Sequence, residues 1–237
     1  MSASESSRLG SIAAKSKYSE GVNGAMIACS FKVFRRFLRP GSILEMGPAE
    51  GMMTDELAKL SLPLTVVEGA PQFCEAIAAR HPQATVVNSL FETFAPAQSF
   101  DNIVLGHVLE HVEDPVDILR RAAGWLNPGG RILAAVPNAR SLHRQAGVLM
   151  GMLEIENALN DMDRYHGHRR VYDPETFRAD FLKSGLTIEI FGGYWLKPVS
   201  NSQIEATWSD ELLDAYMALG ERYPDIASEI YVIANAP

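Results

Sequence analysis

The sequence predicts an α/β protein built on a doubly wound, seven-stranded, mostly parallel sheet, with helices on both faces and an antiparallel strand at its carboxyl end. Two observations lead to this fold. Apolar runs of strand length alternate with segments of helical periodicity along most of the chain. The run at 102–106 is nearly all-apolar, as expected of a strand that is covered on both faces. At 237 residues the chain is long for one domain and short for two, so we expect a single domain with a cap.

Local signals predict each element in order. Residues 1–16 are rich in Ser and Ala and are expected to be mobile, at least without a ligand. The predicted strands are residues 43–46, 64–68, 84–87, 102–106, 131–136, 185–191 and 229–234. The predicted helices are residues 21–38, 52–60, 72–80, 115–126, 145–159, 174–183 and 210–223. Pro40 and Gly41 end the first helix, Asp114 caps the fourth ahead of Pro115, and residues 127–130 form a tight turn.

An insertion interrupts the alternation after Pro137. Residues 138–172 carry the helix predicted at 145–159 and then a polar, aromatic segment at 161–170. Its apolar side chains either line a pocket or pack the helix, and we favour packing; they are Met150, Met152, Leu153, Ile155 and Leu159. Residues 193–208 are predicted to be irregular.

The composition excludes several classes of protein. The net charge of −8 argues against a nucleic-acid partner held by neutralisation of phosphates. No apolar run approaches the ~18 residues that a membrane-spanning helix needs, and the first residues lack the apolar core of a secretory signal. The two cysteines, Cys29 and Cys74, are predicted to be free thiols in a reducing compartment. We therefore expect a cytoplasmic protein.

The turn at residues 43–51, Ile-Leu-Glu-Met-Gly-Pro-Ala-Glu-Gly, carries the ligand hypotheses. A glycine-bearing turn after a strand lets the backbone approach a ligand closely, although such turns also serve packing alone. Glu68 follows Gly47 by 21 positions, near the ~20 that separate such a turn from an acidic residue that binds a ribose diol. A solvated glutamate at a strand end is the alternative for Glu68. A dinucleotide fingerprint would need glycines where Ala49 and Met52 stand.

Four motifs together resemble those of a known enzyme family. Residues Glu45, Gly47 and Gly51 satisfy the pattern acidic-x-Gly-x-x-x-Gly within ILEMGPAEG. The next motifs are VVEGAP, SFDNIVLGHVLEHVEDP and WLNPGGRILAAVPN, and all four fall in order between residues 43 and 138. In these motifs the chain resembles the class I, Rossmann-like S-adenosylmethionine-dependent methyltransferases. It is most similar to the branch that includes the ubiquinone-biosynthesis O-methyltransferases and natural-product small-molecule methyltransferases.

The resemblance implies S-adenosyl-L-methionine as cofactor and S-adenosyl-L-homocysteine as product. It implies that Glu45 holds the ammonium group, that Glu68 binds the ribose hydroxyls, and that Ser89 and Leu90 lie beside the adenine. The full cofactor set is Glu45, Gly47, Pro48, Ala49, Gly51, Glu68, Gly69, Ser89, Leu90 and His107. Many relatives have Asp at the position of Ser89, whose contact would be weaker than a carboxylate's. Pro48 and Ala49 depart from the commoner Gly-x-Gly core, and alanine suits such a turn where φ is negative.

The resemblance also implies a division of the single domain. Residues 1–40 form an N-terminal tail and lid helix, and residues 41–137 form the cofactor-binding half. Residues 138–172 form a cap over the acceptor, and residues 173–237 complete the sheet.

The segment 107–111 lies where the resemblance implies that the methyl group is transferred. An alcohol, phenol or ammonium acceptor must lose a proton, and an imidazole is suited to accept it near neutral pH. We rank His111 first and His107 second as catalytic residues, with His166 and His168 as further candidates. For each of them a loop histidine that hydrogen-bonds the backbone is the alternative.

The same segment matches H-x-x-E-H, a zinc-peptidase pattern that requires both histidines on one exposed helix face. The resemblance adds that ubiquinone-type relatives place a metal-binding group here, for which His107, Glu110 and His111 could supply ligands. Relatives without a metal use the same letters for packing, capping and orientation of the acceptor. We assign no metal.

The acceptor candidates lie mainly in the insertion. They are Tyr18, His143, Tyr165, His166, His168, Arg169 and Arg170. Arg164, Arg169 and Arg170 either clamp a carboxylate or phosphate or form a solvated turn.

We therefore predict methyl transfer from S-adenosylmethionine to a small-molecule acceptor in a biosynthetic reaction, as O-methylation with His-assisted deprotonation. N- or C-methylation of a natural-product or sugar intermediate is the first alternative. An NAD-dependent oxidoreductase and a non-catalytic cofactor-binding protein are the others. We expect a monomer or homodimer without a nucleic-acid partner or a membrane span.

Overall fold

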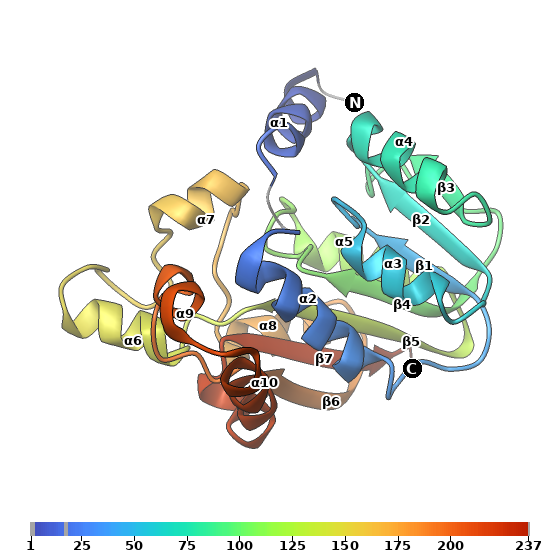
Figure 1. Cartoon of the computed structure of the whole chain (residues 1–237). Helices are drawn as coiled ribbons and strands as arrows, with labels where there is room; N and C mark the ends of the chain where they lie inside the picture. The colour runs from blue at the N-terminus through green and yellow to red at the C-terminus, as the bar shows by residue number, and fades with distance from the viewer. Residues whose placement is uncertain (1–2, 17–18, 237) are drawn as a thin grey trace.

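A single seven-stranded sheet organises the chain (Figure 1). The computed structural model describes residues 3–16 and 19–236. The strands are β1 Ile43–Met46, β2 Leu64–Glu68, β3 Thr85–Asn88, β4 Phe100–Gly106, β5 Leu126–Pro137, β6 Thr187–Tyr194 and β7 Glu229–Asn235. Their order in the sheet is β3-β2-β1-β4-β5-β7-β6, and β7 runs antiparallel to both neighbours while the other pairs are parallel. The predicted doubly wound, mostly parallel sheet with an antiparallel carboxyl-terminal strand is confirmed.

Helices cover both faces of this sheet. They are α1 Ala3–Ala13, α2 Gly21–Phe34, α3 Met52–Ala58, α4 Pro71–Arg80, α5 Pro115–Gly124, α6 Leu142–Leu149, α7 Asp161–His166, α8 Pro174–Lys183, α9 Asn201–Thr207 and α10 Asp210–Leu219. Two short 3₁₀ turns follow, η1 Gly220–Arg222 and η2 Pro224–Ile226. One face packs against α5 and α8, and the other packs against α2, α3, α4, α9 and α10.

The alternation of side chains along the buried strands supplies two separate cores. In β4, Ile103 and Leu105 join the core under α5 and α8, whereas Val104 joins the core under α2 and α3. Side chains alternate between the faces of a strand, so a strand covered on both sides is apolar throughout. The winding reverses between β1 and β4, and this switch point is where doubly wound sheets bind ligands.

The amino terminus contains a helix where the sequence predicted a mobile tail. Helix α1 covers Ala3–Ala13, and it lies between α4 and α7 in Figure 1. Arg8 donates to the carbonyl of Gly167, and Gln72 donates to that of Gly10. These tertiary contacts stabilise a serine-rich segment whose helical propensity alone is modest.

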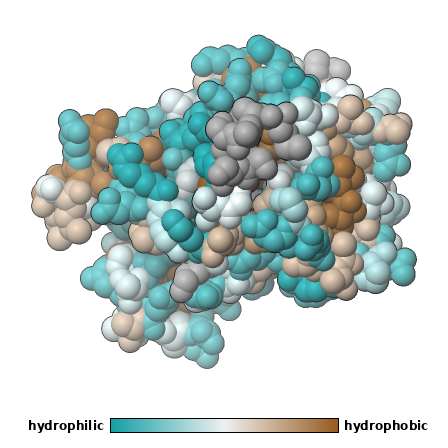
Figure 2. All heavy atoms as spheres, turned by 90° about the horizontal axis from the view of Figure 1, so that it is seen from above, coloured by the Kyte–Doolittle hydropathy of each residue, from teal (hydrophilic) through white to brown (hydrophobic). Residues whose placement is uncertain are grey.

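The insertion differs most from its prediction. The helix predicted at 145–159 ends at Leu149, and Gly151 follows with φ +72°. Met150, Met152 and Ile155 are 72%, 73% and 56% exposed, so they neither pack a helix nor line a pocket. Figure 2 shows apolar side chains at the left end of the molecule, over the segment that follows α6.

Buried hydrogen bonds, rather than helical periodicity, shape the loop after α6. The guanidinium of Arg144 donates to the carbonyls of Glu156 and Ala158 and to the Asp163 carboxylate. Three groups 12 to 19 residues away in sequence are thereby drawn to one buried side chain. The helix prediction over 151–159 was wrong because this polar anchor outweighs the apolar pattern.

Three further boundaries are corrected. The tight turn predicted at 127–130 lies inside β5 as a bulge, because Leu126 pairs with Phe100 and Arg131 already pairs with Asn102. The segment 193–208 was predicted to be irregular but contains α9, whose capping box joins Ser200 and Gln203. Helices α2 and α10 end several residues earlier than predicted, at Phe34 and Leu219.

Two smaller expectations concern the membrane and the thiols. Among the described residues, no helix combines the length and apolar content that crossing a bilayer requires. Cys29 and Cys74 are both free thiols, as predicted, and burial raises the pKa of Cys29 to about 12.

We expect Gly220→Ala to destabilise the protein by about 1–3 kcal/mol, the usual effect of overpacking. A Cβ at Gly220 would lie 2.2 Å from the backbone nitrogen of Trp195 and 2.3 Å from the carbonyl carbon of Tyr194, and backbone cannot move aside cheaply. Gly124 is the matched control because a Cβ there meets open space. Urea unfolding should show a lower midpoint for Gly220→Ala and an unchanged or higher one for Gly124→Ala. Equal midpoints for the two variants would contradict this account.

Candidate functional site

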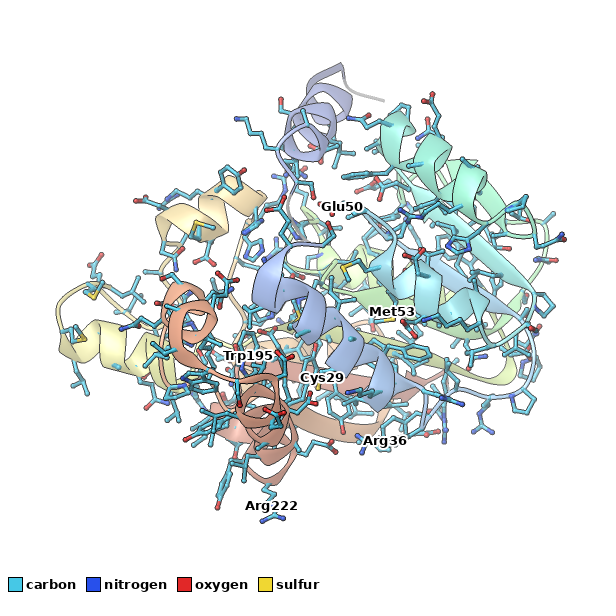
Figure 3. The ribbon with its side chains drawn as sticks, in the orientation of Figure 1. Cys29, Arg36, Glu50, Met53, Trp195 and Arg222 are labelled. Carbon is cyan, nitrogen blue, oxygen red and sulfur yellow. The ribbon has the colours of Figure 1, made fainter. Side chains whose placement is uncertain are left out.

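A cavity of about 640 Å³ opens at the carboxyl ends of β1, β2 and β4, next to the switch point of the sheet. Its floor is formed by the turns that follow these strands, and residues 89–93 after β3 close one side. Met26, Ile27 and Ser30 of α2 and Met53 of α3 line it from one face. Figure 3 shows Met53 on α3, close to α2. Helix α1 covers its mouth with Glu5, Arg8, Leu9 and Ile12.

Nearly all of the predicted cofactor residues line this cavity. They are Glu45, Gly47, Pro48, Ala49, Glu68, Gly69, Ser89, Leu90 and His107. Gly51 does not, because it caps α3 at φ +82° and packs against α4, where a Cβ would meet Ile77 and Arg80. Gly51 therefore shapes the turn rather than the cavity wall.

The turn after β1 has left-handed backbone at Gly47 and Ala49, in addition to Gly51 where α3 begins. Gly47 has φ +66°, and a Cβ there would lie 3.1 Å from Val108 and 3.2 Å from Phe91, so glycine keeps this wall open. Ala49 has φ +48°, which corrects the expectation of a negative φ. That conformation costs an alanine roughly 1–2 kcal/mol. Its N–H donates to Glu68 Oε2 at 3.3 Å, which helps to hold the strained turn.

Glu68 presents a fixed carboxylate at the end of β2. The N–H of Ala70 donates to Oε1 at 2.7 Å, and Ala49 donates to the other oxygen. Burial raises the pKa of Glu68, and these backbone hydrogen bonds oppose the rise. The predicted alternative, a solvated glutamate, is wrong, since the side chain is buried in the cavity wall.

Glu45 is a second buried carboxyl group in the same wall. Its Oε2 accepts a hydrogen bond of 2.6 Å from Thr54 Oγ1. Burial raises its pKa to about 8, and the Thr54 hydrogen bond offsets only part of that rise. The group is therefore mostly protonated at neutral pH, and a cation placed beside it would favour the ionised form.

Ser89 and Leu90 follow β3 and form the side of the cavity beside Gly69. Ser89 donates its N–H to the Glu68 carbonyl at 3.0 Å and its hydroxyl to the Leu90 carbonyl at 2.9 Å. The loop is thus tied to the end of β2, which sets the distance between Ser89 and Glu68.

His107 is enclosed by polar groups on both ring nitrogens. Nε2 lies 3.2 Å from the Tyr194 hydroxyl, and Nδ1 lies 3.5 Å from Glu110 and 3.7 Å from Glu229. Burial lowers its pKa, but the close contact with the Glu110 carboxylate and the charges of Glu229 and Glu110 outweigh burial and raise it. An imidazole whose protonated form is favoured and whose two nitrogens both face polar groups is poorly suited to accept a proton.

His111 has the opposite electrostatic environment. Burial lowers its pKa to about 4, although the Glu110 charge opposes the shift. Its ring packs edge-on against His168, with centroids 4.8 Å apart, and the residue lines the cavity. The imidazole is therefore neutral at physiological pH and can accept a proton. The ranking of His111 above His107 as catalytic residues stays a prediction.

Glu110, His111 and His168 bring their side-chain oxygen and nitrogen atoms within 4.8 Å of one another. Burial opposes ionisation of Glu110, but the hydrogen bond with His107 and the charges of neighbouring histidines lower its pKa to about 2. Among the described residues this group alone combines three such side chains at that spacing. Carboxylate and imidazole are metal-ligand types, so the predicted absence of a metal stays a prediction.

A second cavity of about 540 Å³ adjoins the first and shares Arg8, Ile12 and Arg169 with it. Of the predicted acceptor residues, Tyr165, His168 and Arg169 line this second cavity. Tyr165 donates its hydroxyl to the Lys15 carbonyl at 2.8 Å, which ties α7 to the end of the amino-terminal segment.

The remaining acceptor candidates lie elsewhere. Tyr18 is outside the described residues. His143 and His166 line neither cavity. Arg170 donates to the carbonyls of Leu109, Val112 and Glu113, so its guanidinium supports the loop after β4 and does not face an acceptor.

Several residues of the site had no signal in the sequence. Tyr194 and Glu229 lie more than 80 residues from His107, at the adjoining ends of β6 and β7. Only the sheet order brings them beside the loop after β4. Glu5 and Arg8 have helical i, i+3 spacing, but a serine-rich terminus gave no reason to connect them with the site.

Comparisons with known proteins agree with the fold. The family model described as "Methyltransferase domain" matches residues 27–189, more than half of the chain. This protein belongs to that methyltransferase family, and the predicted membership is confirmed.

Two curated relatives and one solved structure add detail. The chain is 27% identical over 165 residues to the ubiquinone biosynthesis O-methyltransferase of Xanthomonas axonopodis pv. citri, covering 67% of this chain and 68% of that protein. It is 26% identical over 185 residues to the enzyme of the same name from Paramagnetospirillum magneticum, covering 76% and 71%. A glycopeptide N-methyltransferase complexed with S-adenosyl-L-methionine shares the fold, with a TM-score of 0.59, 15% identity and coverage of 87% and 86%.

The contrast between the two histidines predicts opposite titrations. By NMR of the imidazole rings, His107 should remain protonated above pH 6.5, and His111 should be neutral down to about pH 4. His107 therefore stabilises the fold below pH 6.5 and loses that contribution as pH rises through its folded pKa. His111 stabilises the fold above pH 6.5 and loses its contribution as pH falls toward 4.

A variant that removes the charge of Glu229 tests why the pKa of His107 is raised. Glu229→Gln should lower the pKa of His107, because one of the two facing carboxylates is lost. Glu189→Gln removes a carboxylate that pairs with Arg131 instead and should leave that pKa unchanged. An unshifted His107 in Glu229→Gln would disprove the electrostatic assignment.

Proposed function

We propose that the first cavity binds S-adenosyl-L-methionine and that the protein transfers its methyl group to an oxygen of a small-molecule acceptor. One observation carries this proposal. Two buried carboxyl groups at the ends of β1 and β2, Glu45 and Glu68, line the same cavity as the neutral imidazole of His111. The first cavity therefore combines a wall that can bind a cation with a group that can accept a proton.

The residues present fit the cofactor. Glu68 holds its carboxylate rigidly and can accept hydrogen bonds from both hydroxyls of a ribose diol. Glu45 gains its charge when a cation pairs with it, which suits the ammonium group. Gly47 keeps the wall free of a side chain, and Leu90 lines the cavity where it would contact an adenine ring.

The chain's own residues supply positioning, desolvation and proton transfer. When bound, the cofactor supplies an electrophilic methyl group on a sulfonium sulfur. His111 accepts the proton of an acceptor hydroxyl at a ring nitrogen, which leaves the oxygen able to attack. Helices α1 and α2 cover the cavity and exclude water from the reacting atoms. Holding the acceptor in line is itself a large part of such catalysis.

Oxygen is the preferred target for two reasons. The curated relatives are named as O-methyltransferases, and a neutral histidine is useful where a hydroxyl must lose a proton. The N-methyltransferase among the structural neighbours is similar at the level of the fold alone. The net charge of −8 favours a small molecule over a nucleic acid as acceptor.

Binding of S-adenosylhomocysteine tests the cofactor assignment. Glu68→Gln should weaken its affinity by about tenfold or more in calorimetry, because an amide replaces a charged acceptor of two hydrogen bonds. Glu75→Gln changes the same functional group on an exposed position of α4 and should bind normally. Unchanged affinity in a folded Glu68→Gln protein would remove Glu68 from the ribose site.

Turnover of a hydroxylated acceptor tests the proton acceptor. His111→Ala should lose about 10²–10⁴-fold in kcat, the usual contribution of a general base. His81→Ala, at a surface turn where the ring pairs with Asp55, should keep full activity. Because the pKa of His111 is near 4, wild-type activity should not fall off near pH 6.5 and should be lost toward pH 4.

Treatment with a chelator distinguishes a general-base role of His111 from a role as metal ligand. EDTA should leave the wild-type rate unchanged if His111 acts as a general base that holds no metal. If His111→Ala retains about the wild-type rate from roughly pH 5 to pH 9, His111 is not the general base.

A further inference from the structure

The second cavity differs sharply in charge from the first. Four cationic side chains line it, namely Arg8, Lys15, Arg164 and Arg169, and no carboxylate does so among the described residues. The first cavity is lined by the carboxyl groups of Glu45, Glu68, Glu92 and Glu113 in addition to Glu5. A chain with a net charge of −8 thus concentrates positive charge beside an acidic cavity.

The boundary between the cavities holds one carboxylate between two guanidinium groups. Glu5 accepts hydrogen bonds of 2.6 to 3.1 Å from Nε and Nη2 of Arg8, and one of 3.1 Å from Arg169. The hydrogen bond with Arg8 and the charges of both arginines lower the pKa of Glu5, so it is ionised. Two cations share a single anion, which leaves one positive charge at this point.

The same guanidinium groups adjoin the proposed proton acceptor. Arg169 donates to the carbonyl of His111 at 2.9 Å, and Arg8 donates to it at 3.4 Å. The His111 ring contacts His168, which lines the second cavity. A single small molecule can therefore reach His111 with one group and the arginines with another.

We propose that the acceptor carries an anionic group, a carboxylate or phosphate, which binds Arg169 and Arg8 in the place that Glu5 occupies here. This inference rests on the proposed function, because it assigns the acceptor's charge in the same reaction. Arginine pairs with carboxylate and phosphate through two parallel hydrogen bonds, as Arg8 already does with Glu5 by donating from Nε to Oε2 and from Nη2 to Oε1. Glu5 acts as an internal ligand that yields to the acceptor.

The opposite charges of the cavities then orient the two reactants. The acidic wall receives a cofactor with positive sulfonium and ammonium groups, and the basic wall receives an anionic acceptor. An acceptor bound the other way round would place its anion beside the carboxylate of Glu68 and would be repelled.

The rival account is that Glu5, Arg8 and Arg169 only fasten α1. The two accounts predict opposite changes in ligand affinity for Glu5→Gln. If Glu5 only holds α1 in place, the variant should bind every ligand more weakly. If Glu5 competes with the acceptor for the arginines, the variant should bind anionic ligands alone more tightly.

Calorimetry on the full chain saturated with S-adenosylhomocysteine tests the proposal with three probes, 4-hydroxybenzoate, phenyl phosphate and the neutral 4-hydroxybenzamide. At least one anionic probe should bind about tenfold or more tightly than the amide, and which one does so distinguishes carboxylate from phosphate. Arg169→Ala should weaken that probe about tenfold or more and leave the amide unchanged. Glu5→Gln should tighten it severalfold.

Arg222→Ala is the matched control, since Figure 3 shows Arg222 at the opposite end of the molecule from Glu50. It removes the same charge and should leave all three affinities unchanged. Equal binding of the acids and the amide, or no binding of either acid, overturns the anionic acceptor. Failure of S-adenosylhomocysteine itself to bind would instead overturn the proposed function.

Discussion

The buried pairing of His107 with Glu110 and Glu229 is the constraint on which the rest of the site depends. His107 has φ +60°, an unusual conformation for a residue with a Cβ, and the Tyr194 hydroxyl holds the other side of its ring. Removing one partner from a buried ion pair typically costs about 3–5 kcal/mol. The loop after β4 is thereby held in one shape, and this shape sets Val108 against the glycine turn and turns His111 toward the cavity.

That loop is also where the later parts of the chain attach. Arg170 binds the carbonyls of Leu109, Val112 and Glu113, and the N–H of Arg169 donates to the carbonyl of Glu110. The insertion and α1 therefore converge on backbone that the buried charges have already positioned. A surface built in this way places the cationic side chains of Arg8 and Arg169 beside the neutral imidazole of His111. The two adjoining cavities differ in charge because each arginine is placed by the backbone carbonyl groups to which its guanidinium donates hydrogen bonds.

Much of the cofactor side was predictable because its residues are close in sequence. Glu45, Gly47 and Glu68 lie within 25 residues, and a parallel sheet brings the carboxyl ends of successive strands to one edge. The backbone of Ala49 was not predictable, since its positive φ depends on the hydrogen bond to Glu68. The acceptor side was predicted less well. Arg169 lines both cavities, but Arg170 supports the loop after β4 instead, and the segment that forms α1 was predicted to be a mobile tail.

The sequence by itself determined the class of fold, the strand that ends in the glycine turn, the acidic partner at Glu68 and the segment that contains His111. These features are encoded by apolar periodicity and by local turn chemistry, which act over a few residues. Tertiary structure alone decided which histidine has its pKa raised and which has it lowered. His107 and His111 are four residues apart in one loop, yet only His107 faces the end of β7, where Glu229 raises its pKa. Proton affinity is set by burial and by charges brought near in space, and neither is written in local sequence.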